Sequence, residues 1–185
     1  GTGLNASRLY IFRVIEILRE LTGFGLARAE NPVEATQNAD LFAEVSGLVK
    51  TAAVNLAKIS GDLRLLSSGP KAGLAEIRLP EVQAGSSIMP GKVNPVIPEM
   101  VTQVSYQVMA SDMAVSLAVA SGQLELNAFL PLVAHNLLHS MEMLARAARL
   151  LAEKCVREIE ADAGRCAALL GRSQAVITAF VPYIG

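Results

Sequence analysis

The chain has 185 residues, of which 52% are hydrophobic and 4% aromatic, with 16 basic and 17 acidic side chains. This length suits one domain or slightly more and allows a sizeable core. The formal net charge of −1, without a basic stripe, argues against a nucleic-acid partner. The apolar residues are mainly Leu, Val, Ala, Ile and Met, which are typical of packed helices rather than of a β-sandwich.

The hydrophobic excess does not predict a membrane span, because such a helix needs about 18 or more apolar residues with few polar ones. The longest uncharged run, Leu126 to Met141, contains two asparagines, two histidines and a proline. Burial by oligomerisation explains the excess better. Cys155 and Cys166 lack metal-ligand spacing and no signal-peptide pattern is present, so we expect reduced thiols in a cytoplasmic protein.

Two helices are expected in the first third of the chain. Ser7 to Thr22 has apolar residues at helical spacing, and glycines follow its end. The second helix begins at Asn31-Pro32-Val33-Glu34, where Asn31 is a candidate N-cap. It continues to about Ser67 along an apolar seam made of Leu41, Val45, Leu48, Ala52, Leu56, Ile59, Leu63 and Leu66. A seam of this length indicates a helical bundle or coiled coil, and we favour packing between subunits.

Ser68-Gly69-Pro70 ends the second helix, and a long connection runs from Lys71 to Asn94. Connections of this length are usually functional or disordered. A third helix is expected from Asn94-Pro95 to about Ser121, with inward-facing Val101, Val104, Val108, Val115 and Val119. Within it, Asp112 predicts a hydrogen bond to another helix.

A break over 122–131 separates the third helix from a fourth, which is expected from Pro131 to about Arg157. The fourth helix has a stripe of Val133, Leu137, Leu144, Ala148, Leu151 and Cys155. Shorter helical pieces are expected over 163–170 and 173–180. His135 and His139 are four residues apart, but neither an HExxH motif nor a nearby third ligand accompanies them, so we predict no metal site.

The connection contains Gln-Ala-Gly-Ser-Ser-Ile-Met-Pro-Gly-Lys-Val-Asn-Pro, residues 83–95, here named the 83–95 loop. Two glycines give backbone freedom around Ser86 and Ser87, as a lid would need. Lys92 adds a cation, and Asn94 stands at a helix start, where N–H groups and the helix dipole favour a carboxylate or phosphate. The pattern predicts an anion site beside a reactive hydroxyl. In the alternative interpretation Asn94 is simply a cap, Lys92 is solvated and the serines are ordinary loop residues.

Residues Gly85 to Asn94 match the pattern G-S-x-x-M-x-x-K-x-N at every fixed position, and in this the sequence resembles the fumarase/aspartase superfamily. Glu34 to Asn38 and Asn94 to Glu99 resemble the aspartate ammonia-lyases more than the fumarases. Other segments similar to family landmarks occur in the family's order: Gly1 to Asn5, Asp62 to Gly73, Gly122 to Asn127 and the final Ile-Gly.

The resemblance implies a role for each polar residue of the loop. Ser86 would be the general base that removes a proton from the carbon beside the substrate's β-carboxylate. Lys92 and Asn94 would bind the substrate, and Ser87 would assist them. Glu99 matches a position that in fumarases pairs with a histidine from another segment, although an acid there also complements a helix dipole.

We therefore expect an all-α fold: long antiparallel helices of a central helical-bundle domain over 1–160, which assembles into a multi-subunit helical core, and the start of a small C-terminal domain over 161–185. The resemblance implies reversible anti-elimination of ammonia from L-aspartate to give fumarate, without an organic cofactor, in a homotetramer. A class II fumarase acting on malate and a non-catalytic helical assembly module are the alternatives. Because the chain lacks an initial Met and other family segments, we expect it to be a fragment that is inactive alone.

Overall fold

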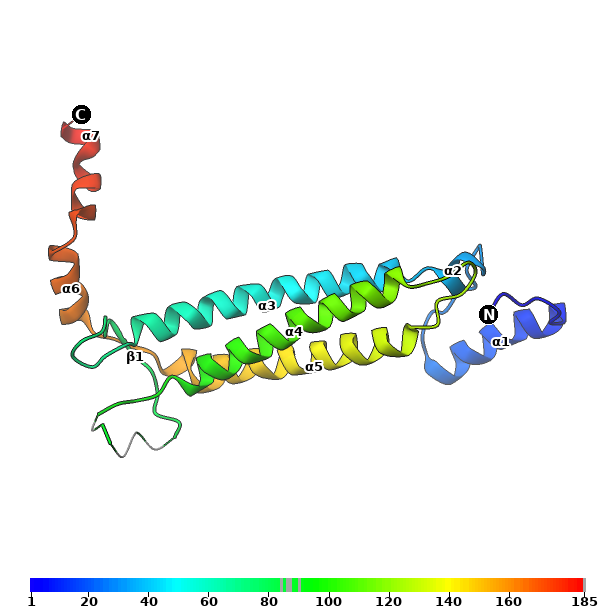
Figure 1. Cartoon of the computed structure of the whole chain (residues 1–185), viewed down its shortest axis with the longest axis horizontal. Helices are drawn as coiled ribbons and strands as arrows, with labels where there is room; N and C mark the ends of the chain where they lie inside the picture. The colour runs from blue at the N-terminus through cyan, green and yellow to red at the C-terminus, as the bar shows by residue number, and fades with distance from the viewer. Residues whose placement is uncertain (84, 86–87, 90, 185) are drawn as a thin grey trace. The chain divides into compact units, whose positions relative to one another are not determined.

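A computed structural model describes residues 1–83, 85, 88–89 and 91–184 of the chain (Figure 1). The expected all-α fold is confirmed. The helices are α1 (Arg8–Thr22), α2 (Glu34–Gln37), α3 (Asp40–Leu66), α4 (Val96–Ala120), α5 (Leu130–Lys154), α6 (Ala163–Gly171) and α7 (Val181–Ile184). Two 3₁₀ segments (Val156–Glu158 and Gln174–Phe180) and two short strands, β1 (Ile77–Arg78) and β2 (Glu160–Ala161), complete the described elements. The piece expected over 173–180 is therefore 3₁₀ rather than α-helical.

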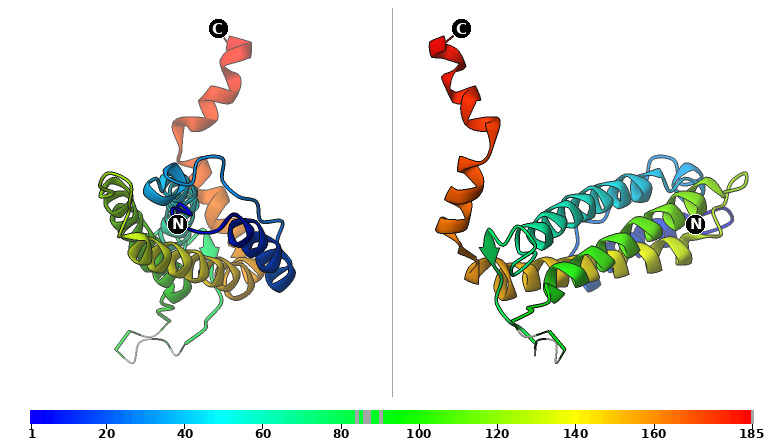
Figure 2. Two further views of the ribbon diagram at one scale, coloured as in Figure 1. Left: turned by 90° about the vertical axis from the view of Figure 1, so that its right-hand side faces the viewer. Right: turned by 60° about the vertical axis from the view of Figure 1, so that its left-hand side comes forward.

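The chain forms two compact units, and α3, α4 and α5 each contribute to both. One unit comprises Gly1–Val49 and Ala110–His139, and the other comprises the remaining residues. Within each unit, part of α4 runs antiparallel to the neighbouring parts of α3 and α5 (Figures 1 and 2). The short connection between α4 and α5 favours an antiparallel arrangement of these two neighbours, whereas α3 and α4 are joined by the long connection that carries the 83–95 loop.

Helix α1 forms where the sequence predicts it. The Ser7 side chain accepts a hydrogen bond from the N–H of Tyr10, which caps the start of the helix. At the other end, Gly23 adopts a left-handed conformation with φ of 70°, and its N–H donates to the carbonyl of Arg19. None of the α1 residues is buried in this chain, although several are large and apolar.

The second helix is interrupted, which corrects the prediction of one continuous helix from Asn31 to Ser67. Asn31 does cap its first turn, since its Oδ1 accepts from the N–H groups of Val33 and Glu34. Asn38 then leaves the helix with extended backbone, and its side chain accepts from the N–H of Asp40, where α3 begins. The break accommodates a contact remote in sequence, because the carbonyl of Thr36 accepts from the N–H of Asn127.

In each unit the core combines residues of α4 and α5, among them valines of α4, with small residues of α3. The predicted inward positions Val101, Val108 and Val115 of α4 are each at most 1% exposed. In α5 the buried alanine is Ala147, whereas the predicted Ala148 is only half-buried. The other residues of the predicted stripe are buried: Val133, Leu137, Leu144 and Leu151 in α5, and Cys155 directly after it.

The face that α3 turns to this core differs from the predicted seam. Its buried residues are Ser46, Ala53 and Ser60, which are seven residues apart. Small side chains at these positions allow helices to approach closely, while Leu41 and Leu48 are 63% and 67% exposed. Only part of the predicted seam therefore faces the core. Leu56 and Leu63 pack against it, whereas Ile59 is exposed, as Leu41 and Leu48 are.

Two polar residues fix the packing of the unit that contains the end of α4. Asp112 is 7% exposed and accepts a hydrogen bond of 2.8 Å from the Ser46 hydroxyl, which confirms the predicted inter-helix bond. Asn127 is also buried, and its Nδ2 donates to the last carbonyls of α4 while its Oδ1 accepts from the N–H of Phe129. Asn127 thus satisfies groups at the end of α4 and the start of α5 that would otherwise lack partners.

The segment after α5 returns to the connection between α3 and α4. β2 pairs antiparallel with β1, with Ile77 opposite Ala161 and Arg78 opposite Glu160. A separate domain beginning at residue 161 stays a prediction. None of the helices in the described part of the chain has the length and hydrophobicity needed to cross a bilayer.

The core predicts a clear difference between two valine substitutions. Val101→Ala should lower the free energy of unfolding by about 2 kcal/mol, because it removes methyl groups at a fully buried position. Val156→Ala, at a position 48% exposed, should change it by less than about 0.5 kcal/mol. Urea denaturation followed by circular dichroism measures both values. Equal effects of the two substitutions would contradict this core.

Candidate active site

The 83–95 loop lies between β1 and α4, and the structure describes it in part. Ser86 and Ser87 lie outside the described residues, so their predicted roles stay predictions. Lys92, Asn94 and Glu99 are described and all three are half-buried.

Two glycines shape the described parts of the loop. An added Cβ at Gly85 would lie 2.9 Å from the carbonyl oxygen of Lys92, too close for any side chain without a backbone shift. Gly91 has a φ of +77°, which disfavours other residues. The N–H of Lys92 donates to the carbonyl of Met89 at 3.2 Å. Gly85 is therefore needed for close approach of two backbone segments as well as for the freedom predicted from sequence.

The start of α4 offers fewer N–H donors than the sequence suggests. The helix begins at Val96, whose N–H donates to the carbonyl of Asn94. The N–H of Glu99 donates to the carbonyl of Pro95. Pro98 has no N–H. Within the described residues the Asn94 side chain makes no hydrogen bond to this helix, so its predicted capping role is not observed. An anion here would depend on the Lys92 and Asn94 side chains and on the helix dipole.

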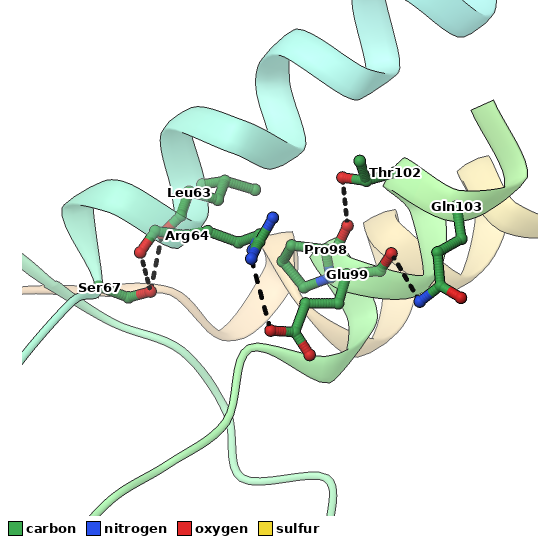
Figure 3. Close-up of polar contacts among 7 residues, drawn as sticks. All are labelled: Leu63, Arg64, Ser67, Pro98, Glu99, Thr102 and Gln103. Carbon is green, nitrogen blue, oxygen red and sulfur yellow. Dashed lines mark hydrogen bonds and ion pairs between the residues drawn. The ribbon is translucent and has the colours of Figure 1, made fainter. Parts of the chain in front are cut away.

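Glu99 lies in the first turn of α4 and faces α3 (Figure 3). Its Oε1 is 3.7 Å from Nη2 of Arg64, and both side chains are partly exposed. An ion pair with that exposure contributes about 0–1 kcal/mol to stability, so its main effect is to orient the two groups. Arg64 lies in the segment Asp62 to Gly73, which is similar to a family landmark, but the sequence alone assigns it no role. A histidine partner for Glu99 from another segment stays a prediction.

A pocket of about 840 Å³ lies beside residues 77–82, which lead into the 83–95 loop and are here named its stem. Its charged lining residues are Arg78, Glu81, Arg157, Glu158, Glu160 and Asp162. Among the described residues of the loop, Gly91, Val93 and Pro95 line the pocket, whereas the predicted substrate-binding residues Lys92 and Asn94 do not.

Asp162 joins the loop stem to the start of α6. Its Oδ1 accepts from the N–H of Arg165 at 2.9 Å and caps the helix, while its Oδ2 accepts from Nη2 of Arg78 at 3.1 Å. The backbone hydrogen bond from Arg165, followed by that from Arg78, lowers the pKa of the Asp162 carboxyl below its ordinary value of 3.8. Sequence reasoning missed this contact, because Arg78 and Asp162 are 84 residues apart and no local pattern links them.

The remaining candidate ligands do not assemble into a metal site. His135 and His139 are exposed, with ring centroids 5.9 Å apart and nearly parallel rings. Neither Cys155 nor Cys166 is in a disulfide, and burial raises the pKa of the Cys155 thiol, which makes it a weak nucleophile. Among the described residues no group of three or more His, Cys, Asp or Glu side chains is placed to hold a metal ion.

Long antiparallel helices that frame this loop are the architecture expected of the fumarase/aspartase superfamily. A family model described as "Lyase" matches residues 1–110, which is more than half of the chain. The chain therefore belongs to this lyase family.

Individual relatives match the chain over its whole length. It is 48% identical to the aspartate ammonia-lyase of Helicobacter pylori (strain ATCC 700392 / 26695), over 100% of the chain and 40% of that protein. It is 53% identical to the fumarate lyase:delta crystallin from Brucella melitensis, with a TM-score of 0.91 over 100% of the chain and 40% of that structure. The class II fumarase from Schistosoma mansoni is 38% identical, with a TM-score of 0.88 over 100% and 42%. The chain spans about 40% of the length of the curated relatives it matches.

The lowered pKa of Asp162 predicts a pH effect on the start of α6. Because the pKa is lower in the folded than in the unfolded state, its stabilisation is fully present above the ordinary value of 3.8 and is lost as pH falls through the lowered pKa. Carboxyl chemical shifts measured by NMR should show Asp162 titrating below that value, and Asp162→Asn should remove the acid-dependent loss of α6 helix signals. Titration of Asp162 at or above its ordinary value would rule out these hydrogen bonds in solution.

Proposed function

We propose that the chain is the central part of a lyase that reversibly eliminates ammonia from L-aspartate to give fumarate. The observation that carries the proposal is the intact pattern from Gly85 to Asn94, in a chain 46–48% identical to relatives named aspartate ammonia-lyase in Helicobacter pylori and Bacillus subtilis. A non-catalytic helical module would have no need to keep a serine, a lysine and an asparagine at these fixed positions.

In the proposed reaction Ser86 takes a proton from the carbon beside the β-carboxylate of aspartate, and the carbon–nitrogen bond then breaks to release ammonia. The intermediate carries a second negative charge on that carboxylate, so cationic and N–H groups must surround it. Lys92 supplies a cation, Asn94 an amide donor, and Ser87 a further hydroxyl. Glu99 acts through a neighbouring group rather than on the substrate.

A serine can act as a base only if its alkoxide is stabilised, since the free hydroxyl is almost fully protonated at neutral pH. A cation and fixed N–H dipoles in a site closed to water lower the pKa of such a group. The position of Lys92, six residues after Ser86 and just before α4, supports this proposal. Residues from segments outside this chain complete the site in the proposed enzyme, whose cytoplasmic location also stays a prediction.

We further propose a homotetramer, because the long helices expose more large apolar residues than a monomer usually tolerates. Leu41 and Leu48 on α3, and Tyr106 and Met113 on α4, are each more than 60% exposed and lie seven residues apart in each pair. This is the spacing of residues that pack between helices of different subunits.

The exposed leucine pair tests the tetramer. Leu48→Glu in the full-length protein should shift the sedimentation coefficient towards that of smaller species, because a charge would enter an apolar interface. Val156→Glu is the matched control, since Val156 is exposed on a 3₁₀ segment rather than on a long helix. A wild-type protein that sediments as a monomer would contradict the proposal.

The substrate and the base are tested together in the full-length protein. Wild type should form fumarate from L-aspartate, read by its ultraviolet absorbance, much faster than from L-malate. Ser86→Ala should lower kcat by about 10²–10⁴-fold, because general base catalysis is worth that much, without changing the circular dichroism spectrum. Ser121→Ala is the control, since that hydroxyl is exposed and bonds to the Leu117 carbonyl of its own helix.

Preferred turnover of malate would support the fumarase alternative, and turnover of neither substrate would support the assembly module. Near-normal activity of Ser86→Ala would refute the role of this serine.

A further inference from the structure

The chain between α3 and β1 forms a closed turn of fixed shape. The N–H of Ala75 donates to the carbonyl of Ser68 at 2.8 Å, and that of Glu76 donates to the carbonyl of Leu66 at 2.9 Å. An added Cβ at Gly73 would lie 2.2 Å from the carbonyl oxygen of Ser68, so a larger residue would force the backbone to move. The turn therefore has little room for variation.

Arg165, at the start of α6, binds this turn from outside. Its Nε donates to the carbonyl of Leu74 and its Nη2 donates to the carbonyl of Gly73, both at 2.8 Å. The two acceptors are consecutive carbonyl groups, which match the planar fork of a guanidinium. The compact ammonium of a lysine cannot reproduce two parallel bonds of this kind.

Arg165 is itself held in place by contacts with the stem of the 83–95 loop. Its backbone N–H donates to Asp162, whose other carboxylate oxygen accepts from Arg78. The backbone N–H of Asp162 donates to the carbonyl of Glu76 at 2.9 Å, and β1 pairs with β2 alongside. We name these three side chains, Arg78, Asp162 and Arg165, the clasp.

The clasp acts close to the loop. It ends at Arg78, five residues before the loop begins at Gln83. Between them Leu79 packs against the core, and Pro80 has a restricted φ angle. A displacement of the turn would therefore also displace the loop, because only a short segment joins them. At a reaction site, a displacement of about 1 Å can lower the rate by about 100-fold.

We propose that Arg165 is a positioning residue for the lyase reaction, which holds the stem of the 83–95 loop from the beginning of α6. This inference rests on the proposed function, in which the loop carries Ser86 and Lys92. It assigns to the segment after α5 a part in catalysis that does not require contact with the substrate.

The test uses Arg165→Met and Arg165→Lys in the full-length protein, with Arg172→Met as the control. Arg172 is an exposed arginine at the other end of α6, and none of its side-chain atoms makes a hydrogen bond or ion pair with the described residues. Arg165→Met should lower kcat by about 10- to 100-fold with little change in KM, because a misplaced loop reaches the reactive geometry less often. Arg165→Lys should recover little of this loss, and Arg172→Met should behave as wild type.

Hydrogen exchange gives a readout that does not depend on turnover. In Arg165→Met, peptides covering 73–82 should exchange faster, while those of α3, α4 and α5 should exchange as in wild type. Unchanged kcat and unchanged exchange would overturn the proposal. Faster exchange throughout the bundle, or full recovery of kcat in Arg165→Lys, would also overturn it. If wild type does not act on aspartate, the proposed function fails and the role of Arg165 in that reaction fails with it, whereas local acceleration over 73–82 would still support the clasp as the contact that holds the turn.

Discussion

A single hydrophobic cluster holds the chain on both sides of the 83–95 loop. Val101 of α4 packs there with Ala147 and Leu151 of α5 and with Cys155 directly after α5. Leu79, just before the loop, and Ile97, just after it, both pack against this cluster. The segments on both sides of the loop are therefore anchored to the same core.

The long helices were predictable from sequence because their determinants are local. Apolar spacing, the Ser7 cap and the Gly23 stop define α1 without any tertiary contact. The interruption at Asn38 was not predicted, and it coincides with a hydrogen bond between Thr36 and Asn127, which lie in distant parts of the chain. The face of α3 was misjudged for a related reason. Periodicity identifies large apolar residues, whereas Ser46, Ala53 and Ser60 are buried because they are small.

The same distinction, between features set by neighbouring residues and features set by distant ones, applies to the candidate site. The residues from Gly85 to Asn94 are contiguous, so their pattern is visible in the sequence and the family resemblance follows from it. Arg165 contacts carbonyl groups more than 90 residues earlier in the chain, and no pattern of spacing could pair them. The contact between Arg64 and Glu99 was hidden for the same reason, because it joins different helices.

The most direct test is a crystal structure of the full-length protein with succinate, a dicarboxylate that carries no leaving group. The account predicts that the Lys92 ammonium and the Asn94 amide lie within hydrogen-bond distance of one carboxylate, with the Ser86 hydroxyl facing the adjacent carbon. Succinate bound elsewhere, with these three side chains directed away from it, would contradict the claim that the loop carries the reactive groups to the substrate.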